Sequence, residues 1–207
     1  YFAFGARFYN QAGALLDLQG DAIFVGSSSA ALVNNGTVRK SAGPGTWYQG
    51  VPFTNNGTVL VQSGTWTVGS TFVSNPGAVW PSAVVGSDNG GGMLVGVLDQ
   101  PLNWLSGSLQ FAMTVASPGV LTISGTGSRY LSGTVTNLGT VNVPATGQSG
   151  FDNGARLYNQ AGGLVDIQGD GYFSVYGSGA MVNNGTVRKS AGSGNFYQGV
   201  PFTNNAT

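Results

Sequence analysis

The sequence predicts an all-β fold: a single-stranded parallel β-helix, or β-solenoid, with about ten coils of about 21 residues. Three observations predict it. One phrase recurs at near-regular intervals, apolar residues stand at fixed offsets from that phrase, and their spacing is not helical. The stretch 53–61 shows the unit, with an apolar residue, an Asn corner, a Gly and then an alternating strand.

The glycine of this phrase marks the coil period. Successive glycines are 19 to 23 residues apart, which is typical of solenoid repeats. Gly96 is an inferred anchor in the least regular part of the chain, and Ala206 replaces the glycine in the last phrase. The clear anchors are Gly13, Gly36, Gly57, Gly77, Gly119, Gly139, Gly162 and Gly185.

A longer repeat contains the short one. Residues 6–58 align without a gap with residues 155–207, a period of 149, and 37 of the 53 aligned positions are identical. We therefore expect residues 1–207 to form one continuous β-solenoid segment, because each coil must stack on its neighbours to bury its apolar residues. The second copy stops where the first continues into a strand, so we expect the sequence to be an excerpt of a longer polypeptide.

The composition excludes several classes of function. Charged residues make up 7% of the chain, the formal net charge is zero, and Cys and His are absent. A neutral chain with few cations disfavours nucleic acid as a partner, and no apolar run approaches the ~20 residues of a membrane span. We expect no disulfide, no thiolate metal site and no cofactor.

Polar residues recur two positions before the anchor glycine, between inward-pointing apolar positions. Asn side chains at turns hydrogen-bond to the backbone and tolerate left-handed conformations. Stacked coils would bring these side chains into a ladder, whereas simple turn preference would not. The expected ladder consists of Asn34, Asn55, Asn75, Asn137, Asn183 and Asn204.

Charged residues also recur at matching offsets. An Asp and a Lys stand four residues after the anchors of adjacent coils, in both copies. This predicts inter-coil ion pairs with backbones ~5 Å apart, against the alternatives of unpaired surface charges or catalysis. The position has inward parity, so each pair is either buried or turned outward by a bulge that leaves Leu16 and Leu18 inside. The expected pairs are Asp17 with Lys40 and Asp166 with Lys189.

Other chemical signals are weaker. Asp17 and Asp21 could act as a carboxylate pair, but a catalytic site copied into each repeat would be unusual. Asp88 in a Gly-rich stretch suggests a Ca²⁺ loop, yet a single carboxylate favours a plain turn. Four Asn-x-Thr sequons, which begin at Asn35, Asn56, Asn184 and Asn205, follow from the turn phrase itself.

Aromatic residues are the strongest candidates for ligand binding. Four tryptophans, with Tyr48, Phe196 and Tyr197, could stack on sugar rings, while core or cap packing is the favoured interpretation. The tryptophans proposed for carbohydrate stacking are Trp47, Trp66, Trp80 and Trp104.

The order of phrases resembles a repeat family of very large bacterial surface proteins. The matching stretches are 57–65, 130–141, 157–162 and 182–192. The resemblance implies a secreted, adhesin-like or autotransporter-like right-handed parallel β-helix, and it carries over no catalytic residues.

Three functional hypotheses follow. The first is a non-catalytic structural repeat segment, a spacer or adhesin stalk, of an extracellular bacterial surface or filament-forming protein. Its partners would be flanking repeats or identical subunits stacked end to end. The alternatives are a polysaccharide-degrading enzyme on the same fold, and a polysaccharide-binding module that uses the tryptophans. An enzyme would need a cluster of Asp, Lys and Arg drawn from Asp88, Asp99, Arg129 and Asp152.

Overall fold

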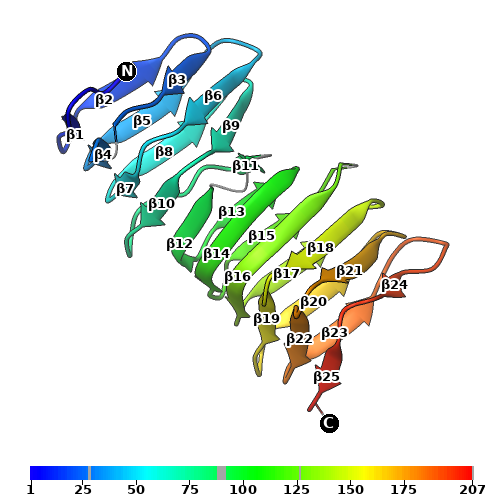
Figure 1. Ribbon diagram of the computed structural model, residues 1–207. Coiled ribbons are helices and arrows are strands. Elements are labelled where there is room, and N and C mark those ends of the chain that lie inside the picture. The colour runs from blue at the N-terminus through cyan, green and yellow to red at the C-terminus, as the bar shows by residue number, and fades with distance from the viewer. Residues whose placement is uncertain (28, 88–91, 126, 207) are drawn as a thin grey trace.

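The computed structural model describes residues 1–27, 29–87, 92–125 and 127–206. Within these ranges the chain is all-β, with parallel strands stacked in about nine turns of about 22 residues. Figure 1 shows the turns stacked along one axis, with the first and last strands at opposite ends. The predicted β-solenoid is therefore confirmed, with a coil count close to the expected ten.

Three columns of strands form the faces of the solenoid. The first face consists of β1 (Arg7–Asn10), β4 (Ala31–Asn34), β7 (Phe53–Asn55), β10 (Thr71–Ser74), β12 (Met93–Leu98), β14 (Gly107–Val115), β16 (Arg129–Asn137), β19 (Arg156–Asn159), β22 (Ala180–Asn183) and β25 (Phe202–Asn204). The second face consists of two sets of strands. β2 (Leu15–Leu18), β5 (Thr37–Lys40) and β8 (Thr58–Val61) form a three-stranded sheet; β13 (Pro101–Trp104), β15 (Val120–Ile123), β17 (Thr140–Val143), β20 (Leu164–Ile167) and β23 (Thr186–Lys189) belong to a nine-stranded sheet. This larger sheet crosses to the third face through residues 83–86, which pair with β13 at their start and with residues 67–68 at their end.

The third face is interrupted in the middle of the chain. Its strands are β3 (Ala22–Phe24), β6 (Thr46–Gln49), β9 (Thr65–Val68), β11 (Ala83–Gly86), β18 (Gln148–Asp152), β21 (Tyr172–Tyr176) and β24 (Tyr197–Gln198). Between β11 and β18, the long strands β14 and β16 serve the first and third faces together. β16 pairs with β18 through its first residues and with β19 through its last.

The irregular middle shifts the register of the first face. Ser74 pairs with Gly96, and Gly96 pairs with Met113, but β12 and β14 continue for two residues beyond these positions. Gly96 thus lies within a strand, with a positive φ of 134°, and is not the turn glycine that the spacing predicted. A Cβ there would lie 2.2 Å from the carbonyl oxygen of Ser74, so the close approach requires glycine. The corner that ends the first face therefore moves by two residues at this point.

The core contains the apolar residues that alternate along each strand. Burial alternates with exposure in β4, β9, β10 and β17, as expected for strands with one face inward. The rings of Trp47 and Trp66 stack at 5.1 Å, and Phe72 meets Trp66 edge-on at 4.9 Å.

All four tryptophan side chains lie in this core. Trp47 and Trp66 are fully buried, and Trp80 and Trp104 are at most 3% exposed. The proposal that these four residues stack on carbohydrate is therefore wrong, because no indole face is open to a ligand. The favoured interpretation, core packing, describes their environment.

Candidate functional site at the stacked corners

An inner Asn ladder runs along the corner between the first and second faces. The side-chain amide of each Asn donates to the carbonyl oxygen of the Asn one coil further on, over 2.6 to 2.8 Å. The same amides reach backbone carbonyls of the next turn, as in the 3.1 Å bond from Asn34 to Thr58. The ladder has two parts, Asn10–Asn34–Asn55 and Asn137–Asn159–Asn183–Asn204.

Five of the six Asn residues expected in the ladder lie in this inner row. Asn75 does not, because Ser74 is the register partner of Asn55. Asn75 belongs to an outer, exposed row, where it donates to Asn56, and Asn56 donates to Asn35 over 2.8 Å. Asn205, Asn184 and Gln160 form the matching outer row in the second copy.

Asn10 and Asn159 are ladder residues that glycine spacing missed. They are the first residues of Asn-Gln-Ala-Gly turns, which are longer than the Asn-Asn-Gly turns. Leu15 pairs with Thr37, so Ala14 and not Gly13 is the equivalent of Gly36. Alignment on the Asn that ends each strand, instead of on the glycine, would have identified both.

The ladder is interrupted in the middle of the solenoid. Val115 is the register partner of Asn137 in the preceding coil. Since valine cannot donate, the buried side-chain oxygen of Asn137 has no hydrogen-bond partner among the described residues. A buried acceptor without a partner costs roughly 1–3 kcal/mol, so the second part of the ladder begins with an unsatisfied group.

The expected ion pairs are wrong by one residue. Asp17 lies opposite Arg39, not Lys40, and accepts two hydrogen bonds from its guanidinium, at 3.1 and 2.7 Å. Asp166 and Arg188 repeat this arrangement at 3.0 and 3.1 Å. The cause is the longer turn described above, which shifts the register. Asp17 faces outward between Leu16 and Leu18, which pack against the core, as the bulge alternative expected for Asp17. The same alternative expected Lys40 to face outward, which is wrong, because its side chain is fully buried.

These bidentate ion pairs lower the pKa of both carboxylates. The guanidinium of Arg39 is the main cause that holds the pKa of Asp17 well below its usual range, and Arg188 does the same for Asp166. The pKa of each Arg is raised by its partner in turn. Bidentate geometry of this kind fixes the relative position of two strands as well as their charges.

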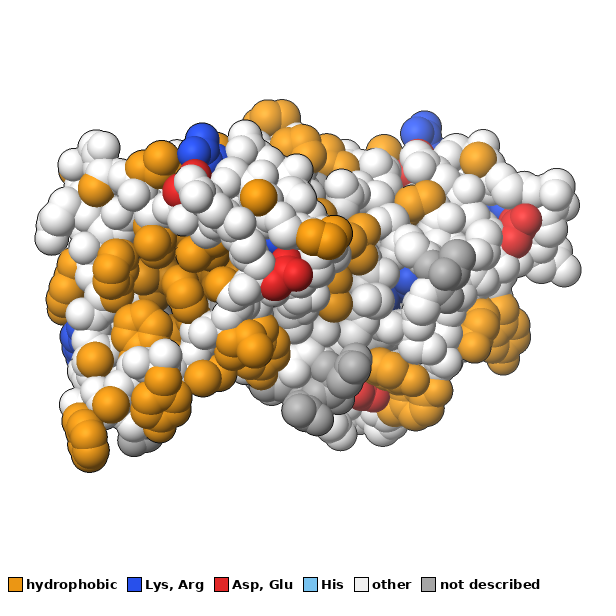
Figure 2. Space-filling model, turned by 90° about the horizontal axis from the view of Figure 1, so that it is seen from above, with side chains coloured by type: hydrophobic (Ala, Val, Ile, Leu, Met, Phe, Trp, Pro, Cys, Tyr) orange, Lys and Arg blue, Asp and Glu red, His pale blue; other side chains and the backbone are white. Residues whose placement is uncertain are grey.

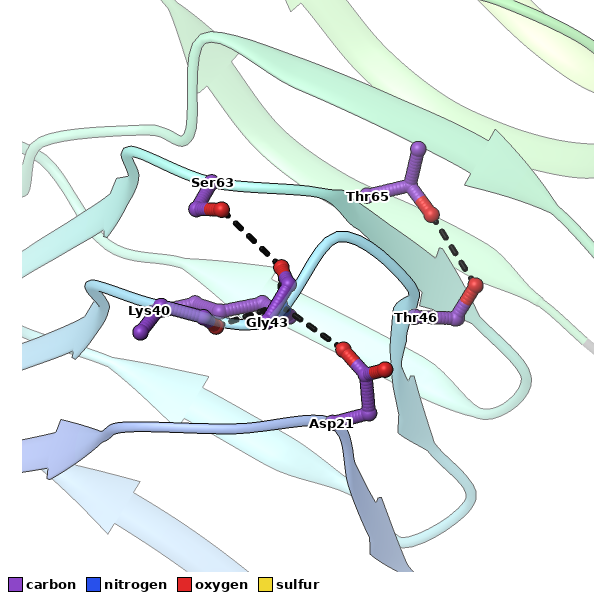
Figure 3. A network of polar contacts seen from close by, with 7 residues as sticks. Asp21, Lys40, Gly43, Thr46, Ser63 and Thr65 are labelled. Atoms are coloured by element: carbon purple, nitrogen blue, oxygen red, sulfur yellow. Dashed lines mark hydrogen bonds and ion pairs between the residues drawn. The ribbon is translucent and has the colours of Figure 1, made fainter.

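Lys40 clamps the next corner of the coil. Its side chain is fully buried, and its Nζ lies 3.2 Å from Asp21 Oδ1, 2.8 Å from the carbonyl of Ala42 and 2.7 Å from that of Gly43. In Figure 3, Lys40 and Asp21 converge at the turn that contains Gly43. The expected partner of Lys40 was Asp17, whereas the structure brings it to Asp21.

The following coil closes over this clamp. Ser63 Oγ donates to the carbonyl of Gly43 over 2.9 Å, and the hydroxyls of Thr46 and Thr65 lie 3.0 Å apart (Figure 3). Lys189 forms the same clamp in the second copy, with Asp170 at 2.9 Å, but its side chain is 30% exposed. No described coil covers Lys189, which explains the difference from Lys40.

Arg129 takes an analogous place in the middle of the solenoid. Its guanidinium donates to the carbonyls of Ser124 and Gly125 at 2.8 and 3.0 Å, and to Gln148 and Ser149 at 3.3 and 3.4 Å. Burial lowers the pKa of Arg129. Because Arg129 is fully buried, it cannot join an exposed catalytic cluster.

No ion pair in the described ranges joins Arg129 to Asp99 or Asp152. Asp88 lies outside the described residues, and Asp99 accepts a hydrogen bond from Gln100 at 3.2 Å. Among the described residues, no group of three or more His, Cys, Asp or Glu side chains could hold a metal ion.

Comparisons with known proteins do not assign the chain to a family. No family model matches the chain, and neither does any curated protein or solved structure. Within the described part of the chain, no helix has the length and apolar character needed to span a membrane. The adhesin-like or autotransporter-like character therefore stays a prediction.

Proposed function

We propose that this chain is a non-catalytic structural segment, a rod-forming spacer or stalk in an extracellular bacterial surface or filament-forming protein. One observation carries the proposal: the chemically distinctive side chains connect coil to coil. The inner Asn ladder, the Asp–Arg pairs and the Lys clamps all join successive turns. Acid–base chemistry would need these same charges to be free, and the resemblance to bacterial surface repeats supports the location.

The ends of the solenoid suggest the partners. Phe202 on β25 is 43% exposed, whereas its counterpart Phe53 in the first copy is 1% exposed and packs against Phe72 at 5.1 Å. The first coil is equally open, with Tyr9 50% exposed. Figure 2 shows hydrophobic side chains gathered toward the end formed by the first coils. Open coil edges are templates for further strands.

The inner ladder gives these two ends a complementary polarity. Each amide donates toward the C-terminal end. Among the described contacts, the amide of Asn204 has no acceptor and the side-chain oxygen of Asn10 has no donor. Flanking repeats or identical subunits that stack head to tail would join such a donor to such an acceptor, and this heterologous contact extends into a filament.

Sedimentation velocity over a wide concentration range tests the proposal, with electron microscopy of the same samples. We expect elongated particles whose average mass rises with concentration. Phe202→Lys should abolish this association, while Leu138→Lys, at a side-facing residue of matched exposure (44%), should preserve it. A compact monomer at every concentration, or equal effects of the two substitutions, would contradict end-to-end stacking of identical subunits.

A further inference from the structure

An exposed aromatic surface lies on the side of the solenoid, near its C-terminal end, where β21 has only β24 beyond it in its column. It is formed by outward positions of β16, β18 and β21, and we call it the tyrosine surface. Tyr172 is 40% exposed and Tyr176 is 46% exposed, at the two ends of β21. The surface consists of Tyr130, Gln148, Gly150, Tyr172, Ser174 and Tyr176.

The rings are held in place by one amide side chain. Gln148 donates to the hydroxyl of Tyr176 and, over 2.8 Å, to Ser174 Oγ, and it accepts a hydrogen bond from the hydroxyl of Tyr172 at 3.3 Å. Tyr172 and Tyr176 are four residues apart on one strand, which separates their Cα atoms by ~13 Å, while their hydroxyl groups both reach Gln148. Their hydroxyl ends are thus fixed while their exposed rings remain open to solvent.

Gly150 provides the room for the third ring. It pairs with Tyr130 on one side and Ser174 on the other, and a Cβ there would lie 2.8 Å from a ring carbon of Tyr130 and 3.1 Å from one of Tyr176. The rings of Tyr130 and Tyr176 come within 5.7 Å of each other above it. A glycine at this outward position lets both rings lean over the sheet.

A hydroxyl-lined cleft adjoins Tyr130. It has a volume of about 470 Å³ and is lined by Ser106, Gly107, Ser108, Gly127, Ser128 and Tyr130. The side-chain hydroxyls of its three serines make no hydrogen bond to the described residues, so they are available to a ligand. An aromatic wall with a few polar groups around it is the usual composition of a small-molecule site.

We propose that the tyrosine surface and this cleft bind a neutral polysaccharide chain. The C–H face of a pyranose ring packs against the electron-rich face of an aromatic ring, and its hydroxyls need partners at the rim. Tyr172 and Tyr176 supply the faces, and Gln148, Ser174 and the cleft serines supply the rim. Adjacent strands repeat at ~4.8 Å, about the length of one sugar unit.

The charge of the surface decides the class of glycan. Asp152, the register partner of Tyr176, is the charged residue at the outward positions of β18 and β21. The two nearest cations in sequence are both engaged with backbone carbonyl groups. Arg129, next to Tyr130, is buried and donates to Ser124 and Gly125, and Arg156 donates to Gly154, Ala155 and Ser178. An acidic polysaccharide would therefore meet the carboxylate of Asp152, while the nearby guanidinium groups are already bonded to carbonyls, which favours a neutral chain.

Titration calorimetry on the full 207-residue chain tests this inference, with cellohexaose, chitohexaose and maltohexaose as neutral probes and oligogalacturonate as the acidic one. We expect saturable binding of at least one neutral probe. Tyr172→Ala and Tyr176→Ala should each weaken it about tenfold. Leu138→Ala is the matched control, because Leu138 is a side-facing residue, 44% exposed and outside the tyrosine surface, and it should bind like the parent chain.

Gln148→Ala provides a second variant, which frees the tyrosine hydroxyls and keeps all the rings. We expect weaker binding with an unchanged circular dichroism spectrum. The inference is overturned if no neutral probe binds, if the Leu138→Ala variant loses as much affinity as the others, or if oligogalacturonate binds more tightly. This test is independent of end-to-end stacking, since the surface lies on the side of the solenoid.

Discussion

Replacing Asn34 by alanine tests whether the inner Asn ladder stabilises the stack. The fully buried side chain of Asn34 makes four hydrogen bonds: it donates to Asn55 and Thr58 and accepts from Asn10 and Gly36. Each bond contributes ~1 kcal/mol net, and the groups left behind are mostly buried. We therefore expect the free energy of unfolding to fall by about 3–5 kcal/mol, a large part of the 5–15 kcal/mol typical of folded domains.

Urea denaturation followed by circular dichroism provides the measurement. Asn75→Ala is the matched control, because Asn75 is an exposed Asn of the outer row, and it should change the free energy of unfolding by only ~0.5 kcal/mol. The reasoning is refuted if the two variants differ by less than ~1 kcal/mol in the free energy of unfolding. In that case the Asn residues would be present only because they favour turns, which is the alternative to a stacked ladder.

Three further predictions concern the charges and the core. Lys40→Met should lower the free energy of unfolding by about 2–3 kcal/mol, because it leaves two corner carbonyls and Asp21 without their donor; Lys189→Met, at a partly exposed site, should cost less than ~1 kcal/mol, and both follow from urea midpoints. Asp17 has a lowered pKa in the folded state, so its stabilising effect is present above pH ~4 and is lost as the pH falls toward the folded value. Asp17→Asn should therefore flatten the decline of stability below pH ~4, and a decline as steep as in the parent chain would contradict the pairing. Trp66→Ala should cost ~3–5 kcal/mol because it leaves a cavity in the aromatic stack, and the parent chain's tryptophan fluorescence should resist quenching by acrylamide.

The sequence predicted the architecture because stacking imposes the same demands on every coil. An apolar residue such as Phe53 and a corner residue such as Asn55 recur wherever a strand ends, so their spacing reveals the coil. Counting from the glycine failed where turns differ in length. The one-residue error at Gly13 placed Asp17 beside Lys40 and hid the role of Asn10.

The middle of the chain and the tyrosine surface could not be predicted in the same way. At Gly96 the strand continues because the backbone passes close to the carbonyl oxygen of Ser74. A single close contact of this kind does not recur from coil to coil, so the sequence pattern does not reveal it. Outward positions face solvent, so stacking does not constrain them to one residue type. Tyr172 and Tyr176 consequently stood apart from every repeat pattern, and only the register between β18 and β21 brings them to Gln148.

The two-residue shift of the first face has a consequence for how such arrays change size. The long period of 149 residues carries Asn10 to Asn159, seven turns later by strand pairing. Recombination between copies would add or remove seven whole turns at a time. An array would therefore change length in steps of ~34 Å, and the strands on either side would keep their pairing. Each added unit would also bring one sideways step of two residues, ~7 Å. A long array would therefore carry its corner rows along a slanted path.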